Sequence, residues 1–342
     1  MRTLSLLVLA LIWCGATALA QAPRFVIDDD EFADQVTHAS ARLLREHKLK
    51  SLGSLRGQVR TKGFGFKSVP LLRQPLGTPV LYERLRESTL AVGTYYKCPD
   101  CGGWHFNGSA GFVVREDGVI CTCCHVVTAE DKDVKESYLV AANSAGRVFP
   151  VQAVLAADTE ADTCLLKLGA TGLAPLPLRP NVRPGERVYC LSHPGGYYFM
   201  FTEGLVSRLN SRREEALDEH GQTNGLLTRP ILLLNVTAEF APGSSGAPIV
   251  DAAGNVVGQV VSIAEGGDPG TGDDDTPASP SVPVRFCTAT EEILRLTNPA
   301  PKPVLPIPKF DRNPKPEPRR ARGERTRPRN DELRKPSRAG DE

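Results

Sequence analysis

Beyond its first twenty residues the sequence has no apolar run long enough to cross a bilayer, which excludes an integral membrane segment in the processed chain. It also has little net charge, because 41 Lys and Arg stand against 40 Asp and Glu. Long helices are disfavoured, since 28 prolines and 31 glycines favour turns and loops. The hydrophobic content of 41% still suffices for a sizeable core.

Residues 1–20 have the pattern of a secretory signal. Arg2 precedes an apolar run from Leu4 to Trp13, and Ala18-Leu19-Ala20 matches a cleavage site of small residues. The alternative is a membrane anchor, but the apolar run is short for spanning and no cluster of charges follows it. We therefore expect export to the periplasm or the extracellular space.

Eight cysteines remain once Cys14 is removed with the signal. An even number of cysteines in an oxidising compartment favours disulfides, although the sequence does not choose among their pairings. Three of the eight lie within apolar strand patterns and fit buried thiols equally well: Cys121, Cys164 and Cys190.

The segment Cys98-Pro99-Asp100-Cys101 allows three interpretations: a disulfide, a structural zinc site or a redox-active pair. Together with His105 and either Cys121 or Cys123, it would supply the thiolate and imidazole ligands that zinc prefers. No second pair of cysteines follows at the spacing of a zinc ribbon. The disulfide is therefore the preferred interpretation, and we expect no metal and no other cofactor.

A serine lies between glycines in Gly243-Ser244-Ser245-Gly246-Ala247-Pro248, just before an apolar strand. Many hydrolases expose a nucleophile on such a tight turn. Gly243 would let the backbone approach a substrate closely, and the amides of Gly243 and Ser245 would form an oxyanion hole. Alone the hexapeptide is weak evidence, because glycine and serine are also ordinary loop residues.

Two upstream motifs supply partners for this serine. Residues 111–127 predict a strand, an Asp-Gly turn and a second strand, after which His125 follows. Residues 158–168 predict an acidic turn entering an apolar strand, where Asp162 would be buried enough to orient an imidazole. His, Asp and Ser thus occur in an order known for catalytic triads. His193 is the rival base, but its Pro-Gly-Gly context indicates a loop.

With these motifs the chain resembles the trypsin-like serine peptidases, and among them the HtrA/Deg branch. The resemblance covers roughly residues 80–297. It departs from the family pattern at Cys123-Cys124, at Ser244 and at Ala247, none of which removes a catalytic group. No PDZ-like segment follows the peptidase, so the peptide sensing and cage assembly of typical HtrA proteins are not carried over.

The resemblance implies an all-β fold of two six-stranded antiparallel barrels, with a short N-terminal helical extension and a disordered C-terminal tail. Within the extension, the charge and apolar patterns predict a helix that starts near Asp28 and ends by Lys50. Residues 265–280 predict an acidic, flexible loop. The expected domains are a signal peptide at 1–20, an extension and connector at 21–78, the peptidase at 79–297 and a tail rich in Pro, Arg and Lys at 298–342.

The resemblance also implies the chemistry and the substrates. Ser245 would attack a peptide carbonyl, His125 would take its proton and pass it to the leaving amine, and Asp162 would orient the imidazole. Proteins or peptides would be the substrates.

Three further residues are assigned to substrate binding: Glu239, Val261 and Ser262. Glu239 lies six residues before Ser245, where trypsin-like enzymes of basic specificity carry an acid at the floor of the primary pocket. A carboxylate there would favour Arg or Lys, whereas HtrA-like peptidases usually have a small residue and prefer aliphatic side chains. The alternative is that Glu239 points to solvent.

Two other functions stay open: a catalytically silent trypsin-like binding scaffold, and an envelope-tethered protein with secondary peptidase activity. Residues 300–342 contain 13 Lys or Arg against 7 Asp or Glu, so the tail could contact an anionic component of the envelope. Nucleic acid is not an expected partner, because a secreted protein seldom meets it.

Overall fold

The computed structural model describes residues 25–60, 63–129, 131–214, 226–265 and 283–297. The expected signal at 1–20, the expected tail at 298–342 and nearly all of the expected acidic loop at 265–280 lie outside these residues. Within the described ranges, no helix has the length and apolar character needed to cross a membrane.

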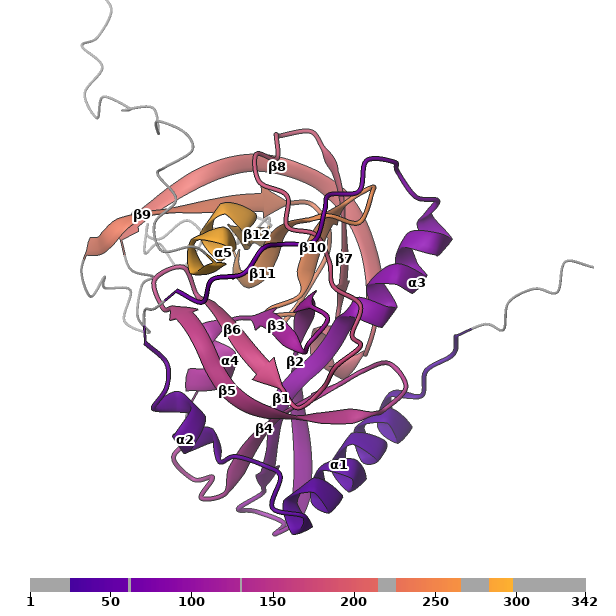
Figure 1. Ribbon diagram of the computed structural model, residues 1–342, viewed down its shortest axis with the longest axis vertical. Coiled ribbons are helices and arrows are strands. Elements are labelled where there is room, and N and C mark those ends of the chain that lie inside the picture. The colour runs from indigo at the N-terminus through magenta and orange to yellow at the C-terminus, as the bar shows by residue number, and fades with distance from the viewer. Residues whose placement is uncertain (1–24, 61–62, 130, 215–225, 266–282, 298–342) are drawn as a thin grey trace, which may run out of the picture. The chain divides into compact units, whose positions relative to one another are not determined.

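Six strands close a first barrel in the order β1-β2-β3-β6-β5-β4, and every neighbouring pair is antiparallel (Figure 1). The predicted Asp-Gly turn joins β2 to β3, with Gly118 at a φ of 90° that favours glycine. The strands are β1 (Thr89–Lys97), β2 (Trp104–Arg115), β3 (Val119–Thr122), β4 (Ser137–Ala142), β5 (Val148–Asp158) and β6 (Thr163–Leu168).

A second closed barrel has the order β10-β11-β12-β9-β8-β7, again antiparallel throughout. The prediction of two six-stranded barrels is therefore confirmed. The strands are β7 (Arg187–Ser192), β8 (Met200–Glu214), β9 (Leu226–Val236), β10 (Pro248–Asp251), β11 (Val256–Glu265) and β12 (Pro283–Ala289).

Short helices surround the barrels. The predicted N-terminal helix is α1, whose first turn is capped by Asp28 accepting from the amide of Glu31 at 3.0 Å. It ends before His47, which has a left-handed φ of 54°. The sequence did not predict α2, α3, α4 or α5. The helices are α1 (Asp29–Arg45), α2 (Leu52–Arg56), α3 (Thr78–Ser88), α4 (Cys124–Thr128), the 3₁₀ turn η1 (Pro194–Gly196) and α5 (Thr290–Thr297).

A shared hydrophobic cluster joins the two barrels and the helices. It includes Phe32 from α1, Leu85 from α3, Leu191 from β7 and Ile293 from α5, all buried. Phe32 also packs on Tyr198, with ring centroids 4.4 Å apart. Because burying such side chains stabilises a fold by roughly 1.5–3 kcal/mol each, α1 contributes to the peptidase core.

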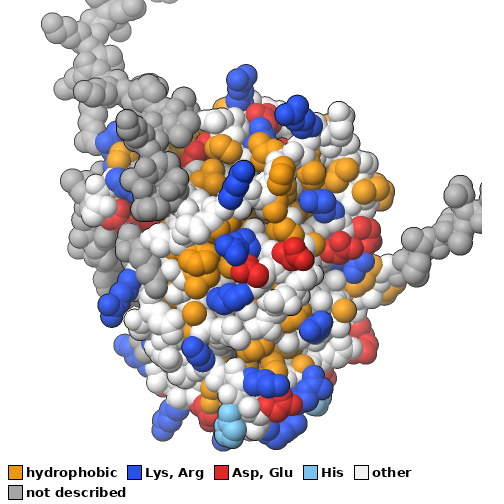
Figure 2. Space-filling model, in the orientation of Figure 1, with side chains coloured by type: hydrophobic (Ala, Val, Ile, Leu, Met, Phe, Trp, Pro, Cys, Tyr) orange, Lys and Arg blue, Asp and Glu red, His pale blue; other side chains and the backbone are white. Residues whose placement is uncertain are grey.

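Charges of both signs are interspersed on the face shown in Figure 2, with apolar side chains between them. The described residues of that face therefore present no continuous basic patch.

Candidate active site

The structure brings His125 and Asp162 together at the edge of the first barrel. His125 lies on α4, directly after β3, and its Nδ1 is 2.6 Å from Oδ2 of Asp162. The backbone amide of His125 donates to the other carboxylate oxygen at 2.9 Å. The two bonds fix the imidazole relative to the carboxylate, and the ring remains 47% exposed on its outer side.

Asp162 sits in a turn that holds an uncommon backbone conformation. Its φ is 50°, in the left-handed region that Asp enters more readily than most residues. Oδ1 of Asp158 accepts from the amides of Glu160 and Ala161 at 3.1 and 3.0 Å, which closes the preceding part of the turn. The aspartate is thus positioned by the local chain as well as by His125.

A buried glutamine contacts the residues that carry this pair, and no sequence motif predicted it. Nε2 of Gln259 donates to the carbonyl of Asp162 at 3.3 Å and to Sγ of Cys123 at 3.0 Å. Its Oε1 accepts from Cys121 and Thr163 at 2.9 and 3.2 Å. The available signal was a polar amide within the apolar run of β11, where a buried polar side chain needs partners.

The turn carrying Ser245 is flanked by two glycines with left-handed backbones. Gly243 and Gly246 have φ values of 94° and 87°, and a Cβ on Gly246 would collide with the carbonyl of Ala110. The carbonyl of Ser245 accepts from the amide of Ala110 at 2.8 Å, which ties the turn to β2 of the first barrel.

A single carbonyl links the serine turn to the histidine helix. The carbonyl of Val260 accepts from the amide of Gly246 at 2.9 Å and from Sγ of Cys123 at 3.1 Å. Gly246 follows Ser245, and Cys123 is two residues before His125. Among the described residues Ser245 Oγ has no hydrogen-bond partner, an arrangement that substrate-free active sites often show.

Two amides at this turn are available to an oxyanion. Within the described ranges, the backbone amides of Gly243 and Ser245 donate to no protein group. The amide of Ser244 instead donates to the carbonyl of Ala241 at 3.0 Å. The side chain of Ser244 is buried and donates to Oγ of Ser192 at 3.1 Å, so of the two serines it is Ser245 that can meet a substrate.

The environment of His125 favours its protonated form. Burial of the imidazole works against protonation, but the hydrogen bond and the negative charge of Asp162 more than offset it, so the pKa of His125 is raised above its ordinary value. Because of the raised pKa, the neutral imidazole is a stronger base toward the proton of a nucleophile.

His193, the rival base, is fully buried and faces away from solvent. Its Nδ1 accepts from the amide of Phe199 at 3.0 Å, and burial lowers its pKa to about 4. It is therefore neutral near pH 7 and is enclosed by Tyr198 and Phe199.

Acid should destabilise the protein partly through His193. The unfolded chain binds a proton below about pH 6.5, whereas the folded chain resists it down to about 4, so stability falls as pH decreases through this window. We expect melting temperatures of His193→Gln to decline less between pH 6.5 and 4 than those of the wild type. The exposed His38→Ala serves as the control and should keep the full decline; an unchanged decline in His193→Gln would contradict the assignment.

The substrate-binding residues do not form the expected pocket. The Glu239 side chain is 79% exposed and its Oε1 lies 3.9 Å from the guanidinium of Arg285. This corrects the hypothesis of a desolvated carboxylate at a pocket floor, because a hydrated carboxylate discriminates weakly. Val261 and Ser262 follow Val260 on β11, half-buried and exposed respectively.

The expectation of disulfides is also corrected. All eight cysteines of the described residues are free thiols, and six of them are buried. They serve as small apolar groups and weak donors; Sγ of Cys124, for example, donates to the carbonyl of Thr163 at 3.1 Å. Burial raises the pKa of Cys121 and of Cys190 to about 12, so both stay protonated.

The proposed zinc ligands separate into two groups. Donor atoms of Cys98, Cys101 and His105 lie within 4.8 Å of one another, whereas Cys123 is grouped with His125 and Asp162. In Cys98, the backbone amides of Cys101 and Asp100 lower the thiol pKa.

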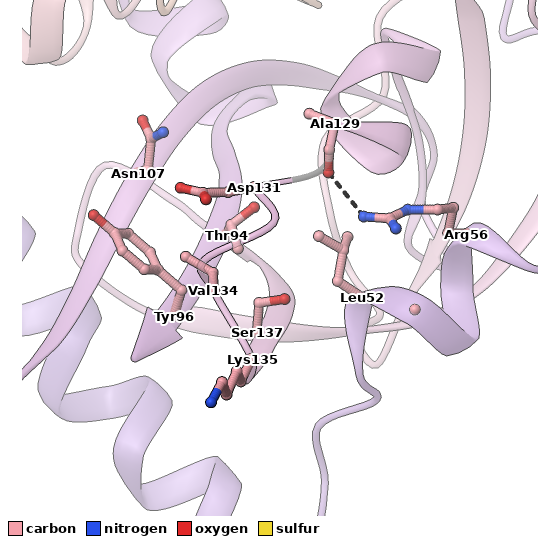
Figure 3. Close-up of a pocket in the computed structure, with 11 residues that line it drawn as sticks. Leu52, Arg56, Thr94, Tyr96, Asn107, Ala129, Asp131, Val134, Lys135 and Ser137 are labelled. Atoms are coloured by element: carbon pink, nitrogen blue, oxygen red, sulfur yellow. Dashed lines mark hydrogen bonds between the residues drawn. The ribbon is translucent and has the colours of Figure 1, made fainter. Parts of the chain in front are cut away.

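A cavity of about 380 Å³ lies beside the first barrel (Figure 3). Tyr96 and Asn107 face Leu52 and Arg56 across it, and Arg56 donates to the carbonyl of Ala129 at 2.9 Å. It contains none of the candidate catalytic residues. Its lining comprises Leu52, Gly53, Arg56, Thr94, Tyr96, Asn107, Ala129, Asp131, Val134, Lys135 and Ser137.

Comparison with known proteins gives one family model that spans the candidate catalytic residues, together with similar proteins and a solved structure. Residues 108–258 match the family model of the trypsin-like peptidase domain. "Serine protease HTRA1" of Xenopus laevis is 32% identical over 152 residues, which cover 44% of this chain and 30% of that protein. "Probable periplasmic serine endoprotease DegP-like" of Halomonas elongata is 30% identical over 153 residues, covering 44% and 28%. The matched part thus spans less than a third of these two relatives.

Among solved structures, "HtrA-type protease AlgW with decapeptide" aligns with a TM-score of 0.47 and 19% sequence identity. The alignment covers 65% of this chain and 66% of that chain.

Proposed function

We infer, from the trypsin-like peptidase domain of the HtrA branch at residues 108–258, that this protein is a serine endopeptidase acting through Ser245, His125 and Asp162. The observation that carries the proposal is the 2.6 Å bond between His125 and Asp162. The glycine-flanked serine turn is joined to Cys123, two residues before His125, through the carbonyl of Val260. Proteins or peptides are the proposed substrates.

Each group has a role that its surroundings support. Ser245 Oγ adds to the peptide carbonyl while Nε2 of His125 accepts its proton, giving a tetrahedral intermediate. The amides of Gly243 and Ser245 donate to the oxyanion. His125 then gives the proton to the leaving amine, forming an acyl-enzyme, and the same steps with water release the acid. Asp162 holds the imidazole and stabilises its charge without itself becoming protonated.

The direct test is hydrolysis of an unfolded protein by the purified chain, with new termini identified by mass spectrometry. We expect internal cleavage that a serine-directed inhibitor abolishes. Absence of new termini would favour a catalytically silent scaffold instead.

Activity should depend on the protonation of His125. The neutral imidazole accepts the proton, so kcat/KM should rise with pH through a pKa above the ordinary value of about 6.5. Asp162→Asn removes the charge that raises this pKa, and the rising limb should therefore move to lower pH. A pH–rate profile checks this; a limb that stays in place in Asp162→Asn would show that another group titrates.

We also propose that the protein is exported and that residues 1–20 are removed. These residues lie outside the described ranges, so the support is the sequence pattern. The N-terminus of the purified protein, expected at Gln21, tests this by mass spectrometry.

A further inference from the structure

Three metal-binding side chains meet at the tip of the β1–β2 hairpin. Cys98 follows β1, Cys101 lies in the turn, and His105 is the second residue of β2. Their donor atoms all lie within 4.8 Å of one another, and Sγ of Cys101 is 3.1 Å from Nε2 of His105. The cluster is separate from the candidate active site, which shares none of these residues.

The backbone of the turn directs one sulfur toward amide donors. The amide of Cys98 donates to the carbonyl of Gly103 at 2.8 Å, and that of Gly102 donates to the carbonyl of Cys98 at 3.0 Å. Gly102 has a left-handed φ of 67°, which completes the tight turn. The amide of Gly103 then donates to Sγ of Cys101 at 3.4 Å, a contact that stabilises a thiolate.

The strands below fix the third donor. His105 pairs with Tyr96 across the hairpin, and their rings lie 5.9 Å apart. One step further along, Trp104 stacks on Tyr95 with ring centroids separated by 4.5 Å. Strand register and aromatic packing therefore hold His105 over the cysteine turn before any ion binds.

We propose that Cys98, Cys101 and His105 bind one Zn²⁺ ion, with water in the fourth position. Zinc bonds sulfur at about 2.3 Å and nitrogen at about 2.0–2.1 Å. In a tetrahedron this places two sulfurs about 3.8 Å apart and a sulfur about 3.6 Å from a nitrogen. The donor atoms lie close to these separations, since all are within 4.8 Å of one another and Sγ of Cys101 is 3.1 Å from Nε2 of His105. Cys101 and His105 are exposed, so the ion can reach the site from solvent.

The second group of possible ligands is a poorer site for zinc. Cys123 is fully buried, and it donates to the carbonyl of Val260 and accepts from Gln259. Asp162 and His125 are already bonded to each other. Binding zinc there would break these bonds. In the hairpin cluster, by contrast, the donor atoms accept no hydrogen bond from any other described side chain.

The test measures metal content and cobalt spectra of the full-length purified protein, and it does not depend on peptidase activity. After chelation and reconstitution, the wild type should bind about one Zn²⁺ per chain. Its Co²⁺ form should show thiolate-to-cobalt charge transfer and the intense visible bands of tetrahedral coordination. Added imidazole should shift these bands by replacing the water.

Variants locate the site. Cys98→Ser, Cys101→Ser and His105→Ala should each lose most of the bound zinc and the corresponding cobalt bands. His38→Ala, which removes an exposed histidine elsewhere, should keep both. Circular dichroism checks that each variant is folded. His105→Cys keeps a zinc-binding donor at this position, so it should bind zinc where His105→Ala does not.

Three results would overturn the proposal. The first is zinc retained in the cysteine variants, and the second is zinc lost in His125→Ala but kept in His105→Ala, which would place the ion at the active site. The third is a protein 2 Da lighter than its sequence mass that forms a Cys98–Cys101 disulfide and binds no zinc without reduction.

Discussion

Replacing Ser245 with Ala should lower peptide turnover by about 10³-fold or more and leave the melting temperature nearly unchanged. The hydroxyl is the proposed nucleophile, and its Oγ makes no hydrogen bond to a described residue. Its loss therefore removes the acyl-enzyme route without breaking a structural contact. Turnover numbers of the two purified proteins on one peptide substrate provide the measurement.

The neighbouring serine is the matched control. Ser244→Ala loses the buried bond to Ser192 at 3.1 Å, so we expect a loss of about 1 kcal/mol in stability with turnover kept within about tenfold. Hydrolysis by Ser245→Ala at the wild-type rate would refute the assignment of the nucleophile. An equal loss of turnover in Ser244→Ala and Ser245→Ala would show that catalysis requires the intact turn and not one hydroxyl.

Replacing Arg229 with Ala should lower the free energy of unfolding by about 3 kcal/mol, the largest stability effect we expect from one charged residue. Arg229 lies on β9 and pairs with Asp158 at the end of β5 and with Glu292 on α5, at 2.6 Å for the latter. Burial works against the charge of Arg229, but Glu292 and Asp158 outweigh it and raise the pKa of the guanidinium.

The loss leaves two carboxylates without their shared cation. The side chains of Asp158 and Glu292 are only 12% and 2% exposed. Among the described residues, Glu292 keeps one other cationic partner, Arg295, at 3.1 Å. Because Asp158 also closes the turn before Asp162, the variant should lose activity as well. Urea unfolding measures the change in free energy.

An exposed ion pair is the control for this experiment. Arg187 lies 3.5 Å from Glu203, with side chains 61% and 54% exposed. Arg187→Ala should change the unfolding free energy by less than about 1 kcal/mol. If both arginine variants lowered the free energy of unfolding equally, the pairing of Arg229 with Asp158 and Glu292 would not be what stabilises the fold.

The sequence predicted features that depend on local pattern. Apolar β-branched runs on both sides of Asp117-Gly118 predicted the β2–β3 hairpin, and the family resemblance supplied the two-barrel arrangement. The glycines beside Ser245 predicted its tight turn, since left-handed backbone favours glycine. Residues 124–128 gave no such signal, and the short helix that carries His125 was not predicted.

Features that depend on distant elements could not be predicted. The Arg229 network joins β5, β9 and α5. These elements are far apart in the sequence and become neighbours only when the chain folds. The orientation of Glu239 depends on the loop geometry, not on its distance from Ser245 along the chain. Cysteine spacing likewise did not decide between disulfides and buried thiols, and six of the eight thiols are free and buried.

The most direct test of the proposed mechanism is labelling with a fluorophosphonate, which reacts covalently with an activated serine. We expect one adduct per chain, mapped by peptide mass spectrometry to Ser245, absent in Ser245→Ala and formed much more slowly in His125→Ala. No adduct on the folded wild type, or an adduct on Ser244, would contradict the account.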